Sequence, residues 1–531
     1  MDDQNSSLTR YQREINLIRE ELARFTHVSV IEALVAGLAM PKENQRAVLM
    51  RMPWAQFFLL KLALTGPGGK RVITQPVFSD IATRLYNLQH LAVDFSNSNI
   101  MIEVRPMLMQ QSWYQRSELD LLRQILRQRM FFASRGGWYT KEFAKITGVS
   151  LRNFFLITFL IHLQFRTHEL TALHINLVSL LFHVCPGIAV QEVFNYFRLI
   201  GTRVADLPAF FASHILSDTP VSEYFQDTPL RSKPVFIEES RLLAVDHTLF
   251  LSGMAEFVPE LMKKVLKSGF KDKFGPDFQS YVGRLLSRLD GVLLDDTAVN
   301  ALYRANGWAG QNADFVLIGS DTVLVVECKA LEPGPIVRSK AEPGTLNDHL
   351  KQDFNKAPVQ ISRTANLMAS LSDYAGHKFY GVVVTHSDFG MFDAGWVSDL
   401  ISPKVRVDIS RDFPNSVIEL NEIIYCAVND IEDICRAHHF GKFDMFEVVA
   451  EAVAKQADAK TMSFVFQQVL AGRVAGLGYP PSEILDELDD LETQINQLVK
   501  HNRKRWANDV GGLLRMHEVV IEALNTLPSD S

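Results

Sequence analysis

The segment from Asn312 to Lys329, NADFVLIGSDTVLVVECK, most limits how this chain can fold. Its two apolar, β-branched runs are Asp314–Ile318 and Thr322–Glu327, and they are separated by Gly319-Ser320-Asp321. That pattern predicts two antiparallel strands joined by a short turn. Buried strands consist almost entirely of Val, Ile and Leu, so charged residues inside them need a specific reason.

Three charged residues of this segment are expected to converge at the open end of the hairpin. If Ser320 and Asp321 form a two-residue loop, Glu327 lies directly opposite Asp314. Because side chains alternate between the faces of a strand, Lys329 shares the face of Glu327. A bulge in the turn would shift this register.

Two opposed carboxylates repel each other and require compensation. At about 5 Å and an effective dielectric constant near 20, the repulsion is roughly 3 kcal/mol. Lys329 supplies part of the compensation, and a bound Mg²⁺ would supply more because hard cations prefer oxygen ligands. The alternative is a buried Asp–Lys–Glu charge cluster without chemistry.

The order Asp314, then Glu327-Cys328-Lys329 at the end of an apolar strand, resembles the signature of the PD-(D/E)XK nuclease superfamily. The resemblance implies an αβββαβ core over roughly residues 274–385. It implies Asp314, Glu327 and the Cys328 main-chain carbonyl as ligands of Mg²⁺, with Mn²⁺ as an alternative. It also implies that Lys329 orients the attacking water and stabilises negative charge on the phosphate.

The segment upstream of the hairpin predicts the first elements of such a core. Apolar spacing after Pro276 predicts an amphipathic helix. Superfamily members often carry a metal-contacting Glu on this helix, and Gln279 stands where it is expected. Gln279 can hydrogen-bond a metal-bound water but brings no charge. A short strand is expected near Asn300–Arg304.

The segment downstream predicts the remaining elements. Residues 346–371 read as helix with an interruption at Pro358. Lys356 and Gln360 lie four residues apart on one face of it, either as participants in the site or as a solvated face. Lys378–Thr385 predicts a buried strand, and a further strand is expected near Ile423–Val428.

We therefore expect an α/β (α+β) fold with a restriction-endonuclease-like αβββαβ core, a large all-α N-terminal domain and a helical C-terminal region. A polar, Pro-containing stretch suggests a linker. The expected divisions are a helical domain at 1–218, the linker at 219–234, the nuclease-like domain at 235–441 and the helical region at 442–531.

Composition adds limits on location and partners. The four cysteines are scattered, no signal peptide is recognisable, and the apolar runs are shorter than a membrane span, so a cytoplasmic protein is expected. A net charge of −7 is not typical of nucleic-acid-binding chains, although a nuclease can concentrate positive charge locally.

The leading functional hypothesis is a metal-dependent nuclease that hydrolyses nucleic acid, with DNA favoured over RNA. Its helical regions would bind a protein partner or a second copy of the chain, and by analogy of architecture it could be the effector of a bacterial anti-phage defence system. The alternative is a catalytically decayed nuclease fold that binds nucleic acid or a partner. A helix-turn-helix regulator built on Trp138–Phe155 is a third hypothesis, but its second helix is too apolar to read DNA.

Overall fold

The computed structural model describes residues 2–39, 50–93, 100–134, 137–167, 173–215, 222–458 and 460–527. They form a mixed α/β protein that is mainly helical and contains two small mixed sheets, so the expected combination of helices and sheets is confirmed. The chain divides into two compact units. Unit 1 comprises Met1–Asp94, Gln110–Val265 and Pro481–Ser531, and unit 2 comprises Phe95–Met109 and Leu266–Pro480.

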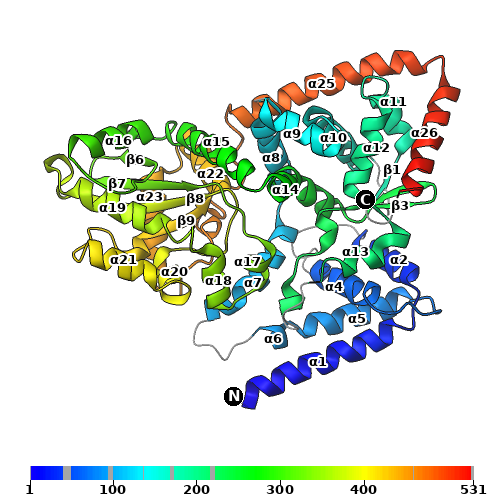
Figure 1. The fold of residues 1–531 in the computed structure, drawn as a ribbon, viewed down its shortest axis with the longest axis horizontal. Coiled ribbons are helices and arrows are strands. Elements are labelled where there is room, and N and C mark those ends of the chain that lie inside the picture. The colour runs from blue at the N-terminus through cyan, green and yellow to red at the C-terminus, as the bar shows by residue number, and fades with distance from the viewer. Residues whose placement is uncertain are drawn as a thin grey trace. The chain divides into compact units, whose positions relative to one another are not determined.

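Unit 1 is built mostly of helices, which run from blue through cyan to green and again in orange and red in Figure 1. Its helices are α1 (Asp2–Leu22), α2 (His27–Leu38), α4 (Pro53–Leu64), α5 (Gln75–Asn87), α6 (Gln89–Ala92), the end of α7 (Ile100–Ser112), α8 (Glu118–Gln128), α9 (Trp138–Thr147), α10 (Leu151–Thr167), α11 (Leu177–Val184), α12 (Val190–Ile200), α13 (Leu207–Ala212), α14 (His247–Leu266), α25 (Glu483–Trp506) and α26 (Val510–Asn525).

Unit 1 also contains a four-stranded sheet, so the expectation of an all-α N-terminal domain is wrong. Strands β1 (Leu173–Ile175), β2 (Gly201–Arg203), β3 (Val235–Glu238) and β4 (Arg241–Ala244) pair in the order β1-β4-β3-β2. The first two strands are three residues long, which is too short to display the alternation of apolar and polar residues that identifies a strand in a sequence.

Helices α9 and α10 form the helix-turn-helix shape that the sequence suggested, with Gly148 in the left-handed region (φ 71°) at the turn. The apolar face of α10 is buried, as Phe154, Ile157 and Ile161 show, so it presents no exposed reading surface. Among the described residues no single helix has the length and apolarity to cross a membrane. This pair, bent by 70°, passes that test only when the two helices are combined.

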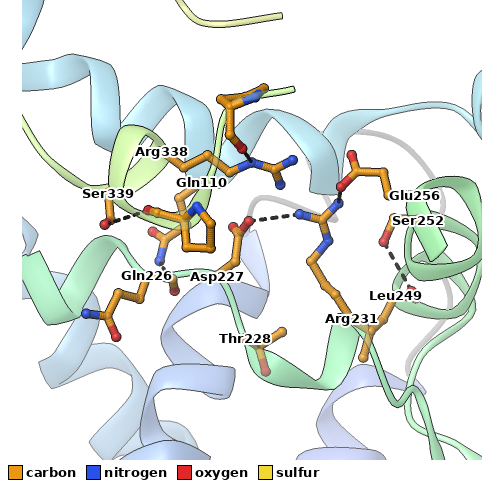
Figure 2. Close-up of polar contacts among 12 residues, drawn as sticks. Gln110, Gln226, Asp227, Thr228, Arg231, Leu249, Ser252, Glu256, Arg338 and Ser339 are labelled. Carbon is orange, nitrogen blue, oxygen red and sulfur yellow. Dashed lines mark hydrogen bonds and ion pairs between the residues drawn. The ribbon is translucent and has the colours of Figure 1, made fainter. Parts of the chain in front are cut away.

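The expected linker is integrated into unit 1; its residues 219–221 lie outside the described part. Arg231 bonds Asp227 at 2.8 Å and forms an ion pair with Glu256 of α14 at 2.7 Å, as Figure 2 shows. Gln110 donates a hydrogen bond to the Tyr224 carbonyl at 2.8 Å. Polar composition suggested a solvated connector, but these side chains are paired with neighbouring elements instead.

Unit 2 carries the sheet that positions the charged hairpin, in green and yellow in Figure 1. Its elements are α15 (Ser268–Leu286), β5 (Val292–Leu294), α16 (Asp296–Ala305), β6 (Phe315–Ile318), β7 (Thr322–Lys329), α17 (Pro335–Ser339), α18 (Pro343–Leu350), α19 (Ala357–Ala369), β8 (Lys378–Thr385), α20 (Ala394–Leu400), α21 (Lys404–Asp412), β9 (Ile423–Ala427), α22 (Val428–His439), α23 (Met445–Gln456) and α24 (Gln467–Leu470).

The five strands of unit 2 pair in the order β5-β6-β7-β8-β9. The pairs β5–β6 and β6–β7 are antiparallel, whereas the pairs β7–β8 and β8–β9 are parallel. The expected hairpin register is confirmed, because Ile318 pairs with Val323 and Val316 pairs with Val325. The expected strands at 378–385 and near 423–428 are also present.

The two faces of this sheet are covered by different helices. Val323 and Val325 of β7 lie in one hydrophobic core with Ile361 and Ala365 of α19. On the opposite face α15 approaches β6 closely, since a Cβ added at Gly283 would lie 2.9 Å from the Phe315 ring. By the alternation of side chains along β7, Glu327 and Lys329 belong to the face that α19 covers.

Two expectations for the elements around the hairpin are wrong. The segment near Asn300–Arg304 is not a strand but part of α16, which is capped by Asp295 accepting a hydrogen bond from the Ala298 amide at 2.9 Å. Helix α15 begins at Ser268, before Pro276, because Phe270 and Phe274 extend its buried apolar face by two turns. Packing of that face outweighs the loss of one backbone donor at Pro276.

The limits of the units differ from the sequence-based divisions. Residues 235–265, expected in the nuclease-like domain, lie in unit 1, and residues 442–480, expected in the C-terminal region, lie in unit 2. Residues 100–109 also belong to unit 2. There the guanidinium group of Arg105 is 1% exposed and donates to the carbonyls of Phe389 at 2.8 Å and Val337 at 2.6 Å.

Candidate functional site

The turn of the β6–β7 hairpin places Asp314 beside the far end of β7. The turn closes with the Gly319 amide donating to the Thr322 carbonyl at 2.8 Å, so Ser320 and Asp321 form a two-residue loop. Asp314 comes directly before β6, and its Oδ2 accepts a hydrogen bond from the Cys328 amide at 2.7 Å. The carboxylate therefore sits opposite the end of β7, as the sequence predicted.

Glu327, Lys329 and Gln360 form a chain of contacts on the α19 face of the sheet. Lys329 Nζ lies 2.5 Å from Glu327 Oε1 and 3.0 Å from Gln360 Oε1. Gln360 Nε2 in turn donates to the Asn312 carbonyl at 3.2 Å. The side chain of Glu327 is 3% exposed and that of Lys329 is 17% exposed, so the ammonium group is fixed between two acceptors while it still reaches solvent.

The two carboxyl groups hold protons more tightly than ordinary side chains do. Burial raises the pKa of Asp314 to about 6, against the lowering effects of the Cys328 amide and Lys329. Burial, together with the charge of Asp314, raises the pKa of Glu327 to about 8. Lys329 lowers the pKa of Glu327, but this single ion pair offsets only part of the burial and repulsion.

One carboxylate oxygen of this site lacks a hydrogen-bond partner and could accept a ligand. Glu327 Oε2 is buried and has no hydrogen-bond partner within the described part of the chain. A buried carboxylate oxygen without a partner is costly, and a cation placed next to it would remove the penalty. The donor set thus fits a hard divalent cation, which commonly takes one or two carboxylates and completes its coordination with water and phosphate oxygens.

The described residues contain no group of three or more His, Cys, Asp or Glu side chains arranged to hold a metal ion. A cation at this position would therefore have two protein carboxylates, Asp314 and Glu327. The Cys328 amide donates to Asp314 Oδ2 at 2.7 Å, which places the backbone of Cys328 beside this carboxylate.

Two of the sequence-predicted participants are not brought into this chain of contacts. Gln279 is half-buried on α15, and no hydrogen bond of the described structure links it to Asp314, Glu327 or Lys329. Lys356 is exposed at the start of α19. Gln360, one helical turn later, is the residue of that helix that reaches Lys329.

Thr364 is a supporting residue that the sequence did not reveal. Its side chain lies on α19 one turn after Gln360 and is fully buried. The hydroxyl shares a hydrogen bond with the Tyr303 hydroxyl at 2.9 Å and accepts one from the Ala313 amide at 2.9 Å. It thereby fixes the backbone next to Asp314. Its spacing of four residues from Gln360 places Thr364 on the same face of the helix, and this was the sequence signal that could have indicated its role.

Replacing Thr364 with valine is expected to lower the free energy of unfolding by about 1–3 kcal/mol. The substitution preserves the shape of the side chain but leaves the buried Ala313 amide and Tyr303 hydroxyl without their partner. Urea-induced unfolding measures the change, with the exposed Thr297→Val as a control. Equal stabilities for the two variants would contradict the role assigned to Thr364.

A second polar pair, also missed, lies at the same end of the sheet. His386 follows β8 directly, and its Nδ1 is 2.8 Å from Glu332 Oε1. The His386 ring meets the Phe274 ring edge-on at 5.2 Å, which places the pair on the α15 face. Its position just beyond the carboxyl end of a parallel strand was the available signal.

Comparisons of the chain with protein-family models, curated proteins and solved structures found no match.

Proposed function

We propose that this chain is a metal-dependent nuclease whose unit 2 contains a PD-(D/E)XK, restriction-endonuclease-like core. The observation that carries the proposal is the buried pair of carboxylates, Asp314 and Glu327, with Lys329 held 2.5 Å from Glu327 and one Glu327 oxygen lacking a partner. The element order α15, β5, β6, β7, α19, β8 supports it, with α16, α17 and α18 as additional helices.

In this proposal Asp314, Glu327 and the Cys328 carbonyl hold Mg²⁺, or alternatively Mn²⁺. When bound, the ion would polarise the scissile phosphate and lower the pKa of a water molecule. Asp314 is oriented by the Cys328 amide, so its free oxygen is directed by the backbone of β7. Gln360 accepts a second hydrogen bond from Lys329, and together with Glu327 it fixes the ammonium group, which would stabilise developing negative charge.

A panel of nucleic acids tests the proposal. Purified protein is incubated with double-stranded, single-stranded and circular DNA and with RNA, in Mg²⁺, in Mn²⁺ and in EDTA. We expect cleavage of DNA that requires a divalent cation and stops with EDTA. Protein that cuts none of these substrates in either metal would contradict the proposal.

The second candidate function is a decayed nuclease fold that binds nucleic acid or a protein partner without hydrolysis. It is favoured by Gln279, which brings no charge where the resemblance leads us to expect a Glu. Calorimetric titration with Mg²⁺ separates the two functions. A nuclease should give a binding signal that Asp314→Ala abolishes, whereas nucleic-acid binding without any Mg²⁺ signal supports the decayed fold.

A further inference from the structure

A polar pocket lies beside the candidate site in unit 2. It is formed by α16 and the loop that leads into β6, has a volume of about 470 Å³, and is lined by side chains that include Asp296, Asn300, Arg304, Trp308 and Asn312. This volume is in the range of small-ligand sites. Nothing in the nuclease proposal uses this pocket.

The pocket shares a wall with the charged site. The Asn312 carbonyl accepts a hydrogen bond from Gln360, whose other amide atom holds Lys329. Asp296, at the start of α16, lines the same pocket. Because Asn312 lines the pocket and its carbonyl is bonded to the residue that holds Lys329, a ligand in the pocket would lie beside a phosphate bound at Lys329.

The lining combines an aromatic ring with amides and one cation. Trp308 is half-buried, and its ring is braced edge-on by Tyr303 at 5.4 Å. Asn300 lines the pocket and donates through Nδ2 to Asp296 at 2.9 Å, so its amide group supplies a hydrogen-bond acceptor, Oδ1, as well. Arg304 is exposed and bonds the Asn300 carbonyl at 3.3 Å. Aromatic, amide and guanidinium groups are the surfaces that bind nucleobases by stacking and edge hydrogen bonds.

The negative charge of Asp296 favours a nucleobase over a phosphate group as the occupant of the pocket. A carboxylate in the lining repels a second phosphate group but accepts hydrogen bonds from the amino or imino groups of a base. The neutral base is therefore the part of a nucleotide that fits this pocket. A base inside a duplex cannot enter such a pocket unless it leaves the stack.

We propose that this pocket binds one unpaired nucleobase of the strand whose phosphate lies at Asp314, Glu327 and Lys329, with Trp308 as the stacking surface. The substrate class is then single-stranded or locally unpaired DNA. The position of the phosphate rests on the proposed nuclease function, whereas binding of the base depends only on the pocket.

Binding measured in EDTA tests the pocket apart from cleavage. Fluorescence anisotropy compares a single-stranded DNA oligonucleotide, the blunt duplex of the same sequence, and that duplex with one bulged base. We expect Trp308→Ala to weaken binding of the single strand and the bulged duplex about tenfold, and to leave the blunt duplex unchanged. Trp308→Phe, which retains a ring, is expected to recover most of the loss.

Two further variants control for folding and for general effects. Trp396→Ala removes another half-buried tryptophan that packs on the same core, and it should leave all three affinities unchanged. Arg304→Ala alters an exposed residue and should weaken single-strand binding even if Trp308→Ala fails to fold. The pocket proposal is overturned if folded Trp308→Ala, or failing that Arg304→Ala, binds the single strand as wild type does. An equal loss on the blunt duplex also overturns it.

The outcomes separate the two proposals. Trp308-dependent binding without any cleavage in Mg²⁺ would contradict the nuclease function alone. Cleavage in Mg²⁺ by a protein whose single-strand binding does not depend on Trp308 would contradict the nucleobase pocket alone.

Discussion

Replacing Lys329 with alanine is expected to slow Mg²⁺-dependent DNA cleavage by about 10²- to 10³-fold, the usual cost of removing one preorganised electrostatic group from an active site. The ammonium group is positioned by Glu327 at 2.5 Å and Gln360 at 3.0 Å, so two acceptors fix it in place before substrate binds. Single-turnover cleavage at saturating Mg²⁺ measures the chemical step directly.

Lys356→Ala is the matched control for this prediction. The sequence offered Lys356 as either a participant in the site or part of a solvated helix face, and its side chain is exposed at the start of α19. The control variant should cleave at the wild-type rate. If Lys329→Ala cleaves within about threefold of Lys356→Ala, electrostatic stabilisation of the transition state by Lys329 is excluded.

The second large effect concerns stability without metal. The pKa of Glu327 is raised from 4.5 to about 8, so between these values the folded protein keeps a proton that the unfolded chain releases. Unfolding then frees a proton, and the free energy of unfolding falls as the pH rises from about 5 to about 8. Asp314, with a pKa of about 6, adds to this fall at the lower end of the range.

Mg²⁺ should reverse this loss, because it binds the ionised carboxylates of the folded state. Urea unfolding at pH 6 and pH 8, in EDTA and in Mg²⁺, measures both effects. Glu327→Gln should flatten the pH dependence in EDTA and remove the stabilisation by Mg²⁺, while the exposed Glu342→Gln should behave as wild type. Stability in EDTA that rises from pH 6 to pH 8 would contradict the buried, protonated state of Glu327.

The sequence was sufficient to predict the hairpin because local rules determine it. Apolar runs on both sides of Gly319-Ser320-Asp321 permit few registers, and a slip by one residue would move Glu327 to the other face. The same apolar character identified β8 and β9. The charged trio followed from the register, since Asp314, Glu327 and Lys329 are the charges that the hairpin carries into its buried end.

The features that were missed depend on distant contacts. The segment Asn300–Arg304 has the length of a strand, but the Asp295 cap and the burial of Val299 and Tyr303 make it part of the ten-residue helix α16. Thr364 gains its role only when α19 lies against Tyr303 and Ala313. The assignment of 442–480 and 481–531 to different units likewise reflects tertiary packing, which no local pattern encodes.

The most direct test of the proposed activity is single-turnover cleavage of circular DNA, single-stranded and supercoiled, by wild type and Asp314→Asn. The asparagine keeps the size of the side chain but removes the charge that would hold the cation. If Asp314 and Glu327 bind the metal that drives cleavage, wild type opens the circles in Mg²⁺ and not in EDTA, and Asp314→Asn is slower by at least about 100-fold. Equal rates for the two proteins, or cleavage that persists in EDTA, would contradict that role.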